Sequence, residues 1–494
     1  MATKILQSIL PQELHPEVVG ASSIPIDALC FDSRQAGPGC CFFAIRGTQA
    51  DGHRFVAQAV AQGACAVVCE ELPAERPAHV CFVRVDSSAR ALGLMSAAFF
   101  DHPSSRLKLV GITGTNGKTT TATLLHRIAM QLGHRAGLLS TVVNRVVDAE
   151  LPAHHTTPDP VELNRLLDLM CREGCEYCFM EVSSHAVVQH RIAGLRFAGA
   201  VFSNITHDHL DYHGTFAEYI KAKQGLFNML EPTAFAITNA DDRNGMVMVQ
   251  NSPARVSTYA LRAMADVRVR IVENHFDGMQ LNIDGVELWT RLVGRFNAYN
   301  VAAIYTTLRC LGFEQQQVLP PLSAVGAVPG RFEYIRSAGG VVAVVDYAHT
   351  PDALQNVLGT ITDIMAGKGQ LICVVGCGGN RDRTKRPEMA RIAARMSHRA
   401  VLTSDNPRFE EPQAIVDDML RGLDAEQSQR TLCVVDRRQA IRTACALARP
   451  GDVVLVAGKG HEDYQEVQGV RHHFDDREVV RETLGCAPQP KSNN

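Results

Sequence analysis

VGITGTNGKTTTATLL, residues 110–125, combines an apolar run, a glycine turn, the pair Lys118-Thr119 and a helix-like pattern. This order is typical of a phosphate-binding P-loop, in which backbone N–H groups at a helix N-terminus surround phosphate oxygens. The usual G-x-x-x-x-G-K-[ST] spacing would place its first glycine at Ile112, whereas the glycines here are Gly111 and Gly114. The segment therefore predicts a shortened nucleotide loop in which Lys118 supplies positive charge and Thr119 can bind Mg²⁺.

Length and composition narrow the class of protein. A chain of 494 residues exceeds what one hydrophobic core usually supports, so about two to four domains are expected. The net charge of -3 argues against a dedicated nucleic-acid binder. The sequence shows neither a secretory signal nor an apolar run of roughly 18 residues, and its 15 cysteines suit a reducing compartment. A cytoplasmic protein that contacts no membrane is expected.

Three regions differ in their pattern. Residues 1–88 carry short apolar runs (CCFFAIRG, CAVVCEEL, HVCFVRVD) between Gly and Pro turns, which predicts a small α/β domain. Residues 89–330 alternate strands such as YCFMEVS, GAVFSNIT and TAFAITN with amphipathic segments, as in a mostly parallel sheet covered by helices. Residues 331–494 repeat this alternation with VVAVVDYA, QLICVVGC, RAVLTSD, TLCVVD and DVVLVAG. A Rossmann-like sheet is predicted there, although no G-x-G-x-x-G fingerprint indicates NAD.

Polar clusters follow two of the apolar strands. Glu181 ends the strand in FMEVSSHAVVQHRI, where Mg²⁺ would be a natural partner for a buried carboxylate and a solvated glutamate is the alternative. The segment SNITHDHLDYHG also fits a zinc hydrolase, but convincing Cys or third His ligands are lacking. Its candidate ligands are His207, Asp208, His209, Asp211 and His213. In CREGCEYC, thiols packed at a helix–strand junction are favoured over a zinc or iron–sulfur site.

Six motifs in order, GTNGKTT, MEVSSHAVVQHR, NITHDHLDYHG, GRFNAYN, DYAHTPD and SDNPR, resemble those of the Mur ligases of peptidoglycan synthesis. The similarity covers almost the whole chain, and the shortened P-loop is this family's form. It implies a three-domain α/β architecture: a uridine-nucleotide domain (1–88), a central ATPase with a mostly parallel sheet (89–330) and a Rossmann-like amino-acid domain (331–494).

The resemblance also implies the chemistry. A Mur ligase forms ADP and phosphate while it joins an amino acid to a UDP-linked muramoyl peptide through an acyl phosphate, and it thereby serves cell-wall growth, cell shape and division. The motifs are most similar to those of the branch that adds meso-2,6-diaminopimelate to UDP-N-acetylmuramoyl-L-Ala-D-Glu. ATP, Mg²⁺ and a CO₂-derived carbamate on Lys223 are expected, in a monomer without nucleic-acid partners.

The site residues are carried over position by position. The residues expected to act in catalysis are Lys118, Glu181, His209 and Lys223, and the expected metal ligands are Thr119, Glu181, His209 and carbamylated Lys223. The expected ATP contacts are Gly114, Thr115, Asn116, Gly117, Lys118, Thr119, Thr120, Asn297, Asn300, Arg331 and Asp346. The expected uridine-substrate contacts are Phe31, Ser33, Thr48, Gln49, Ala50, His155, Thr156, Thr157, Ser183, Gln189 and Arg191, of which Phe31 and Thr48 depart in type from the family pattern. The expected diaminopimelate contacts are Arg381, Asp405, Asn406, Pro407, Arg408, Gly458 and Glu462.

Several alternatives remain at this point. Lys221 lies two residues from Lys223 and could be confused with it. Within the family, an L-lysine-adding ligase or a folylpolyglutamate synthetase competes, the second being disfavoured by the uridine-domain match and by DNPR. Outside it, the competing classes are a non-ligase P-loop ATPase and a catalytically dead binding homologue. The dead homologue should have lost Lys118, Glu181 or Lys223, and all three are present.

Overall fold

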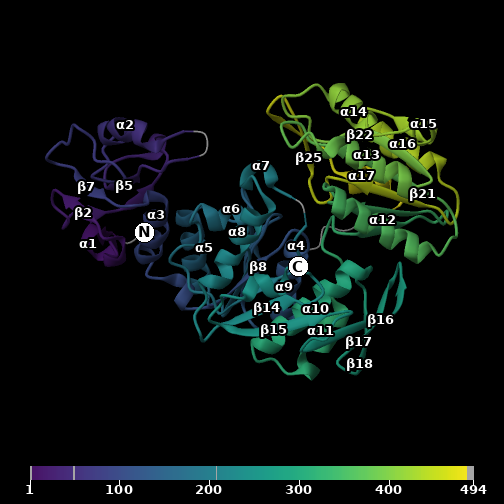
Figure 1. Ribbon diagram of the computed structural model, residues 1–494, viewed down its shortest axis with the longest axis horizontal. Helices are drawn as coiled ribbons and strands as arrows, with labels where there is room; N and C mark the ends of the chain where they lie inside the picture. Colours follow the sequence, from purple (N-terminus) through teal and green to yellow (C-terminus); the bar gives the residue numbers. More distant parts are fainter. Residues whose placement is uncertain (1–2, 48–49, 207, 487–494) are drawn as a thin grey trace.

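The computed structural model describes residues 3–47, 50–206 and 208–486. Three large sheets follow one another along the chain, each in its own layered α/β unit (Figure 1). In Figure 1 the amino-terminal unit is purple, the central unit teal and the carboxy-terminal unit green to yellow. The expected three-domain α/β architecture is confirmed, whereas the exact domain limits remain predictions.

The amino-terminal sheet has the order β2-β7-β6-β5-β4, in which β4 to β7 are parallel and the edge strand β2 is antiparallel. Successive residues of a strand point to opposite faces of the sheet, and the neighbours Phe42 and Phe43 belong to two different buried apolar clusters. Both faces of this sheet are therefore apolar and buried. The elements are β1 (Lys4–Ile5), α1 (Leu6–Ile9), η1 (Gln12–Leu14), β2 (Glu17–Val19), β3 (Pro25–Ile26), β4 (Ala28–Cys30), η2 (Ser33–Gln35), β5 (Cys40–Phe43), η3 (Gly52–Phe55), α2 (Val56–Ala61), β6 (Ala66–Cys69), β7 (Cys81–Arg84) and α3 (Ser88–Phe99).

The central sheet has eleven strands in the order β11-β10-β9-β12-β8-β13-β14-β15-β16-β17-β18. The strands from β9 to β16 in this order are parallel, with the P-loop strand β8 between β12 and β13. The elements are η4 (Pro103–Ser105), β8 (Lys108–Thr113), α4 (Lys118–Gln131), β9 (Ala136–Leu139), β10 (Asn144–Val146), β11 (Ala149–Leu151), α5 (Pro160–Arg172), β12 (Tyr177–Glu181), α6 (Ser184–Val188), β13 (Gly199–Phe202), α7 (Leu210–His213), α8 (Phe216–Asn228), β14 (Phe235–Asn239), α9 (Gly245–Val249), β15 (Arg255–Ala260), β16 (Val267–His275), β17 (Gly278–Ile283), β18 (Val286–Thr290), α10 (Arg295–Cys310) and α11 (Gln315–Ala324).

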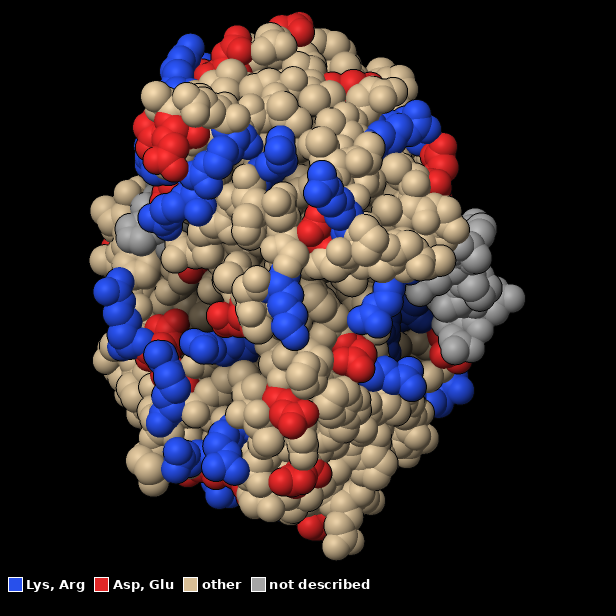
Figure 2. All heavy atoms as spheres, turned by 90° about the vertical axis from the view of Figure 1, so that its right-hand side faces the viewer, with Lys and Arg blue, Asp and Glu red and all other residues tan. Residues whose placement is uncertain are grey.

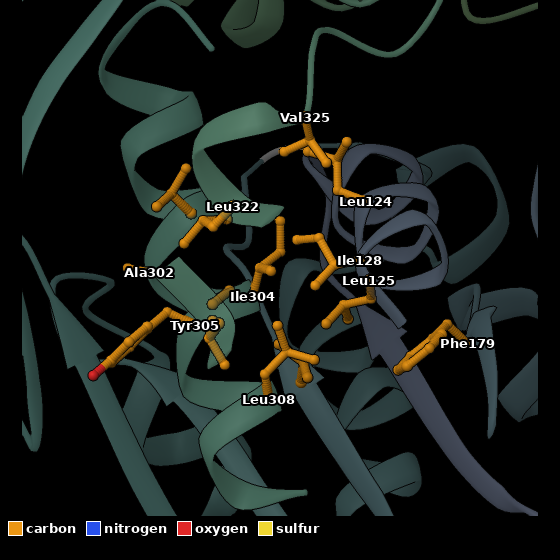
Figure 3. Close-up of a cluster of buried hydrophobic side chains, with 14 of the residues drawn as sticks. Leu124, Leu125, Ile128, Phe179, Ala302, Ile304, Tyr305, Leu308, Leu322 and Val325 are labelled. Atoms are coloured by element: carbon orange, nitrogen blue, oxygen red, sulfur yellow. The ribbon is translucent and has the colours of Figure 1, made fainter. Parts of the chain in front are cut away.

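Helices α4 and α10 pack together on one face of this sheet (Figure 3). Leu125 and Ile128 of α4 face Ile304 and Leu308 of α10, and all four side chains are fully buried. Nearly every residue of α10 from Asn297 to Leu308 is buried, and so is nearly every residue of α4 from Thr119 to Ala129, so both helices are covered on most sides. This packing fixes the helix that begins at Lys118, and with it the P-loop.

Both ends of the central sheet are extended by antiparallel strands that the sequence patterns did not indicate. β10 and β11 form a hairpin beside β9, and β17 and β18 continue the sheet beyond β16. In β16–β18 exposed and buried residues largely alternate, as expected where one face of an antiparallel sheet meets solvent. The parallel middle of the sheet carries the predicted motifs.

The carboxy-terminal sheet has the order β19-β20-β24-β21-β22-β23, with five parallel strands and the antiparallel edge strand β19. The five runs predicted from the sequence are these parallel strands, so the Rossmann-like prediction is confirmed. The elements are β19 (Glu333–Arg336), β20 (Val342–Asp346), α12 (Pro351–Met365), β21 (Leu371–Cys377), α13 (Lys385–Met396), β22 (Arg399–Ser404), α14 (Pro412–Leu420), α15 (Ala425–Gln429), β23 (Thr431–Cys433), α16 (Arg437–Leu447), β24 (Val453–Ala457), β25 (Tyr464–Val467), β26 (Val470–His473) and α17 (Asp476–Thr483).

Basic and acidic side chains are interspersed over the face shown in Figure 2. Within the described part of the chain, no helix combines the length and apolar character needed to cross a membrane.

Candidate active site

The P-loop links the end of β8 to the start of α4, and two of its glycines are required by the fold. Gly114 and Gly117 have φ values of 147° and 87°. A Cβ atom on Gly114 would lie 2.0 Å from the Ser203 hydroxyl, and one on Gly117 would lie 2.5 Å from Asn300 Oδ1. Any other residue would strain the loop or collide with its neighbours, which explains the spacing of GTNGKTT.

Two lysine side chains converge on one carbonyl oxygen of this loop. The Lys118 ammonium lies 2.8 Å from Gly114 O and 2.9 Å from Thr115 O, while the Lys223 ammonium lies 3.0 Å from the same Gly114 oxygen. Burial lowers the pKa of Lys118, although Glu181 and Asp208 oppose this shift. Lys118 therefore places positive charge where phosphate groups would bind.

Lys223 is almost completely buried in α8. Its side chain is 1% exposed and its Nζ lies 4.6 Å from the centre of the Tyr219 ring. Burial and the neighbouring Lys118 lower the pKa of Lys223 well below its usual value. Lys221, by contrast, is 76% exposed and faces Glu218 at the surface. Of these two lysines, the structure brings Lys223 to the P-loop.

Glu181 at the end of β12 is also buried, being 1% exposed. Its Oε2 accepts a hydrogen bond from the Thr119 hydroxyl at 3.0 Å, and its Oε1 accepts one from the backbone N–H of Thr141 at 2.8 Å. Arg331, which follows the central domain, donates to the same Thr119 hydroxyl at 3.1 Å. The alternative of a solvated glutamate is excluded for Glu181, because its carboxylate lies beneath the P-loop helix.

His209 lies on the segment after β13 with a positive φ of 55°. Partial burial, opposed by Asp208 at 3.5 Å, lowers the pKa of His209 to about 4, so the imidazole is neutral at physiological pH. Burial disfavours the charged form of Asp208, but His209, His349 and Lys118 outweigh it and the pKa of Asp208 is lowered. The candidate His207 lies outside the described residues.

The expected adenine-side residues stand beside the loop on α10. Asn300 donates to Asn297 Oδ1 at 3.0 Å, and Asn297 donates to the Val293 carbonyl at 2.8 Å. On the other side, Asp346 at the end of β20 accepts the Phe332 N–H at 2.6 Å. Burial raises the pKa of Asp346 to about 6, against the opposing charge of Arg331.

The expected uridine-substrate residues fall into two groups. Thr157, Ser183, Gln189 and Arg191 form one hydrogen-bonded network at the carboxyl end of β12. Arg191 donates to Thr157 O at 2.8 Å and to Gln189 Oε1 at 2.6 Å, and Ser183 N–H donates to Thr157 Oγ1 at 3.1 Å. Thr156 accepts from Thr141 at 3.1 Å.

The second group lies in the amino-terminal domain. Phe31 is 42% exposed after β4, Ser33 donates to Gln58 at 3.0 Å, and Ala50 is exposed. His155, also exposed, belongs to the central domain. Thr48 and Gln49 lie outside the described residues. The set therefore spans two domains.

The expected amino-acid residues meet at the carboxyl ends of β21, β22 and β24. Arg408 donates to Gly379 O at 2.8 Å, and Asn406 donates to Glu462 Oε2 at 2.8 Å. Gly458, with a φ of 119°, admits the Asp405 carboxylate, which would lie 2.7 Å from a Cβ there. Arg381 is exposed and lies beside Gly378, close to Arg408; Pro407 is next to Gly379.

Three further residues belong to this site although the residue-by-residue carry-over did not name them. Asp352 of the carboxy-terminal domain accepts from Asn116 of the P-loop at 2.9 Å. Tyr219 hydrogen-bonds Thr115 at 3.1 Å, and Lys459 is fully buried between Asn406 and Glu462. Asp352 lies in the motif DYAHTPD, and Lys459 lies between the predicted residues Gly458 and Glu462. These two residues could therefore have been predicted from the motifs.

Three models of known protein domains match this chain. The family described as Mur ligase middle domain matches residues 112–308, the Mur ligase glutamate ligase domain matches 330–460, and the Mur ligase family catalytic domain matches 25–100. The chain belongs to the Mur ligase family. Non-ligase P-loop ATPases are thereby set aside as a class.

Full-length relatives share about half of the residues. The chain is 52% identical over 479 residues to the UDP-N-acetylmuramoyl-L-alanyl-D-glutamate–2,6-diaminopimelate ligase of Bacteroides fragilis, covering 97% of this chain and 98% of that protein. It is 53% identical over 468 residues to the ligase of the same name from Cytophaga hutchinsonii, covering 94% and 96%.

Solved Mur ligase structures superpose on almost the whole chain. One ligase of the same name is 33% identical with a TM-score of 0.68, covering 97% of this chain and 99% of that one. A MurF ligase from Thermotoga maritima in complex with ADP, at 19% identity and a TM-score of 0.62, covers 92% and 96% and shows the same fold.

Proposed function

We propose that this Mur ligase joins meso-2,6-diaminopimelate to the D-glutamyl carboxylate of UDP-N-acetylmuramoyl-L-Ala-D-Glu at the expense of ATP, as a step of peptidoglycan precursor synthesis. The substrates are those in the names of relatives about half identical over nearly their full length. The observation in the geometry that carries the proposal is the convergence of Lys118 and the buried Lys223 on Gly114. A loop that only switched or bound a nucleotide would have no evident need for the second lysine.

The reaction has two chemical steps. The glutamyl carboxylate attacks the γ-phosphorus of ATP, ADP leaves, and an acyl phosphate forms. The amine of the amino acid then attacks the acyl carbon, and the tetrahedral intermediate expels phosphate as the amide forms. Lys118 stabilises the negative charge that develops on the transferring phosphoryl group. The phosphorylation is needed because a free carboxylate is a poor electrophile.

The residues around Glu181 fit Mg²⁺. The Thr119 hydroxyl and the Glu181 carboxylate lie 3.0 Å apart, and hard oxygen ligands are those that Mg²⁺ prefers. Within the described residues no group of three His, Cys, Asp or Glu is arranged to hold a metal. Mg²⁺ when bound neutralises phosphate charge, and the resemblance implies His209 as a further, nitrogen ligand.

The buried environment of Lys223 supports the carbamate that is expected on its side chain. Only a neutral amine adds to CO₂, and burial beside Lys118 favours the neutral form of Lys223. The addition forms an N–C bond and releases a proton, and it turns an amine into a carboxylate-like group. Such a group at this position would place a negative charge near the Lys118 ammonium and add a metal ligand.

The substrate domains can also be assigned. The amino-terminal domain with Phe31, Ser33 and Ala50 holds the uridine nucleotide, and the Arg191 network receives the muramoyl peptide. In the carboxy-terminal domain, Arg408 and Arg381 bind carboxylates of the incoming amino acid, and Glu462 binds its distal ammonium. We infer a cytoplasmic location, because all three substrates are soluble metabolites, and the monomer expected from the resemblance stays a prediction.

One experiment tests the proposal directly. Phosphate release from ATP is measured with the UDP-muramoyl dipeptide and either meso-diaminopimelate or L-lysine, and the product mass is determined. We expect release and a tripeptide product with diaminopimelate. Equal use of L-lysine would refute the assignment of meso-diaminopimelate as the amino-acid substrate. Phosphate release without any peptide product would refute the ligase reaction.

A further inference from the structure

Lys459 is a buried cation for which the proposed reaction has so far no role. It follows β24, its side chain is 0% exposed, and its Nζ lies 3.1 Å from Asn406 Oδ1 and 3.1 Å from Glu462 Oε2. The ring of Tyr464 is centred 5.3 Å away. Burying an ammonium is costly unless it is paired, so these partners are required for the lysine to be there at all.

Lys459 fixes the orientation of the Asn406 amide. Asn406 Oδ1 accepts from both Lys459 and the backbone N–H of Glu466 at 3.0 Å, while Asn406 Nδ2 donates to Glu462 Oε2 at 2.8 Å. A flipped amide would point its N–H₂ group at two donors. The amide and the Glu462 carboxylate are thus held in one arrangement by the same ammonium.

Glu462 stands among several charged and titratable groups. Burial and the Asp405 carboxylate raise the pKa of Glu462, and Lys459 and Asn406 oppose that rise. Burial and the negative charge of Glu462 raise the pKa of Tyr347 and of Tyr464, so both tyrosines lie within electrostatic reach of that carboxylate. Arg437 is nearby, but its guanidinium is bound at 2.7 Å and 2.8 Å by the buried carboxylate of Asp476. Lys459 is the cation that hydrogen-bonds Glu462 directly.

We propose that Lys459 is a positioning residue for the incoming amino acid: its ammonium keeps Glu462 as an oriented carboxylate that receives the distal ammonium of the substrate. The inference rests on the proposed function and adds a residue to it. Without Lys459, Asp405 and Glu462 would be two carboxylates in one buried site, and one of them would take up a proton. A protonated Glu462 would no longer attract the substrate ammonium.

The test is the pH dependence of KM in the full-length enzyme with Lys459→Met. At about pH 7 we expect KM for meso-diaminopimelate to rise about tenfold or more, since one unit of pKa corresponds to a factor of ten. This increase should shrink as the pH is raised and Glu462 ionises again, while wild-type KM changes little over the same range. KM values for ATP and for the UDP-muramoyl dipeptide should stay near those of the wild type.

Glu462→Gln is the matched control, because it removes the carboxylate but keeps the size of the side chain. Its KM for diaminopimelate should be raised at every pH. In the Glu462→Gln background, adding Lys459→Met should change KM little, because the lysine acts through the carboxylate. This double variant also leaves no charged partner of Lys459 unpaired, so the comparison remains available if Lys459→Met alone does not fold.

Two results would overturn the inference. One is an increase in KM that does not depend on pH in Lys459→Met, and the other is a large further loss in the double variant. Either would mean that Lys459 only stabilises the fold. A wild-type enzyme that does not use diaminopimelate at all would instead refute the proposed function.

Discussion

Replacing Arg408 should change which amino acid the enzyme accepts. Arg408 is 21% exposed, its Nη1 is held at 2.8 Å by Gly379 O, and its Nε lies 3.8 Å from Glu466. These contacts orient a planar fork that can bind a carboxylate through two N–H groups. Meso-diaminopimelate carries a distal carboxylate that L-lysine lacks. Arg408 can therefore pair with the distal carboxylate of the first substrate and would lack that additional partner with the second.

The magnitude follows from this geometry. A hydrogen bond to a charged group contributes about 1.5–3 kcal/mol, and a bidentate pair loses part of that gain to desolvation. About 3 kcal/mol in net discrimination, or roughly 100-fold in kcat/KM, is a reasonable expectation. Arg408→Ala should lose about this factor with diaminopimelate and change the low activity with L-lysine much less.

The assay compares kcat/KM for the two amino acids by phosphate release. Arg408 has a φ of 53°, so Arg408→Asn is a useful second variant because asparagine tolerates the left-handed region. Arg408→Lys keeps the charge but loses the fork, and an intermediate loss is expected. Arg421, 73% exposed in the same domain, provides the control Arg421→Ala, which should behave as wild type. The reasoning fails if the ratio of the two kcat/KM values is unchanged in all Arg408 variants.

Three further outcomes are expected. Lys118→Ala should reduce turnover by orders of magnitude with little loss of stability, because the ammonium acts on the phosphoryl group and does not pack in the core. A variant that keeps most of its activity in a kinetic assay would contradict the P-loop assignment. Lys223→Ala should be nearly inactive and partly restored by small carboxylic acids, whereas Lys221→Ala, which changes an exposed side chain, should remain active. Crystallographic density that shows an unmodified Lys223 amine in the nucleotide-bound enzyme at neutral pH would contradict the carbamate. Small-angle scattering should show compaction when the UDP-muramoyl dipeptide, the amino acid and a nonhydrolysable ATP analogue are all bound, because the P-loop and the Arg408 segment belong to different domains; an unchanged radius of gyration would argue against closure.

The local sequence pattern was sufficient to predict the elements that hold the candidate catalytic residues. The P-loop, the strand ending at Glu181 and the parallel strands of the carboxy-terminal sheet were all predicted, because a strand and the polar turn after it are encoded in adjacent residues. The antiparallel strands β17 and β18 were not indicated, since the partners of such strands are chosen by register and by solvent exposure of one face. The helix α3 is indicated by the pattern SARALGLMSAAFF, but only the structure shows that it packs on the amino-terminal sheet and on α5 of the central domain.

The sequence by itself determined the family, the order of the motifs and the type of chemistry, because these depend on residue identity and spacing along the chain. Only the tertiary structure decided which side chains meet. It buried Lys223 beside Lys118 while leaving Lys221 in solvent, and it brought Asp352 from another domain to Asn116. It also enclosed Lys459 between Asn406 and Glu462. The physical reason is that burial and charge pairing arise between segments distant in sequence, and these set the protonation and orientation of each group.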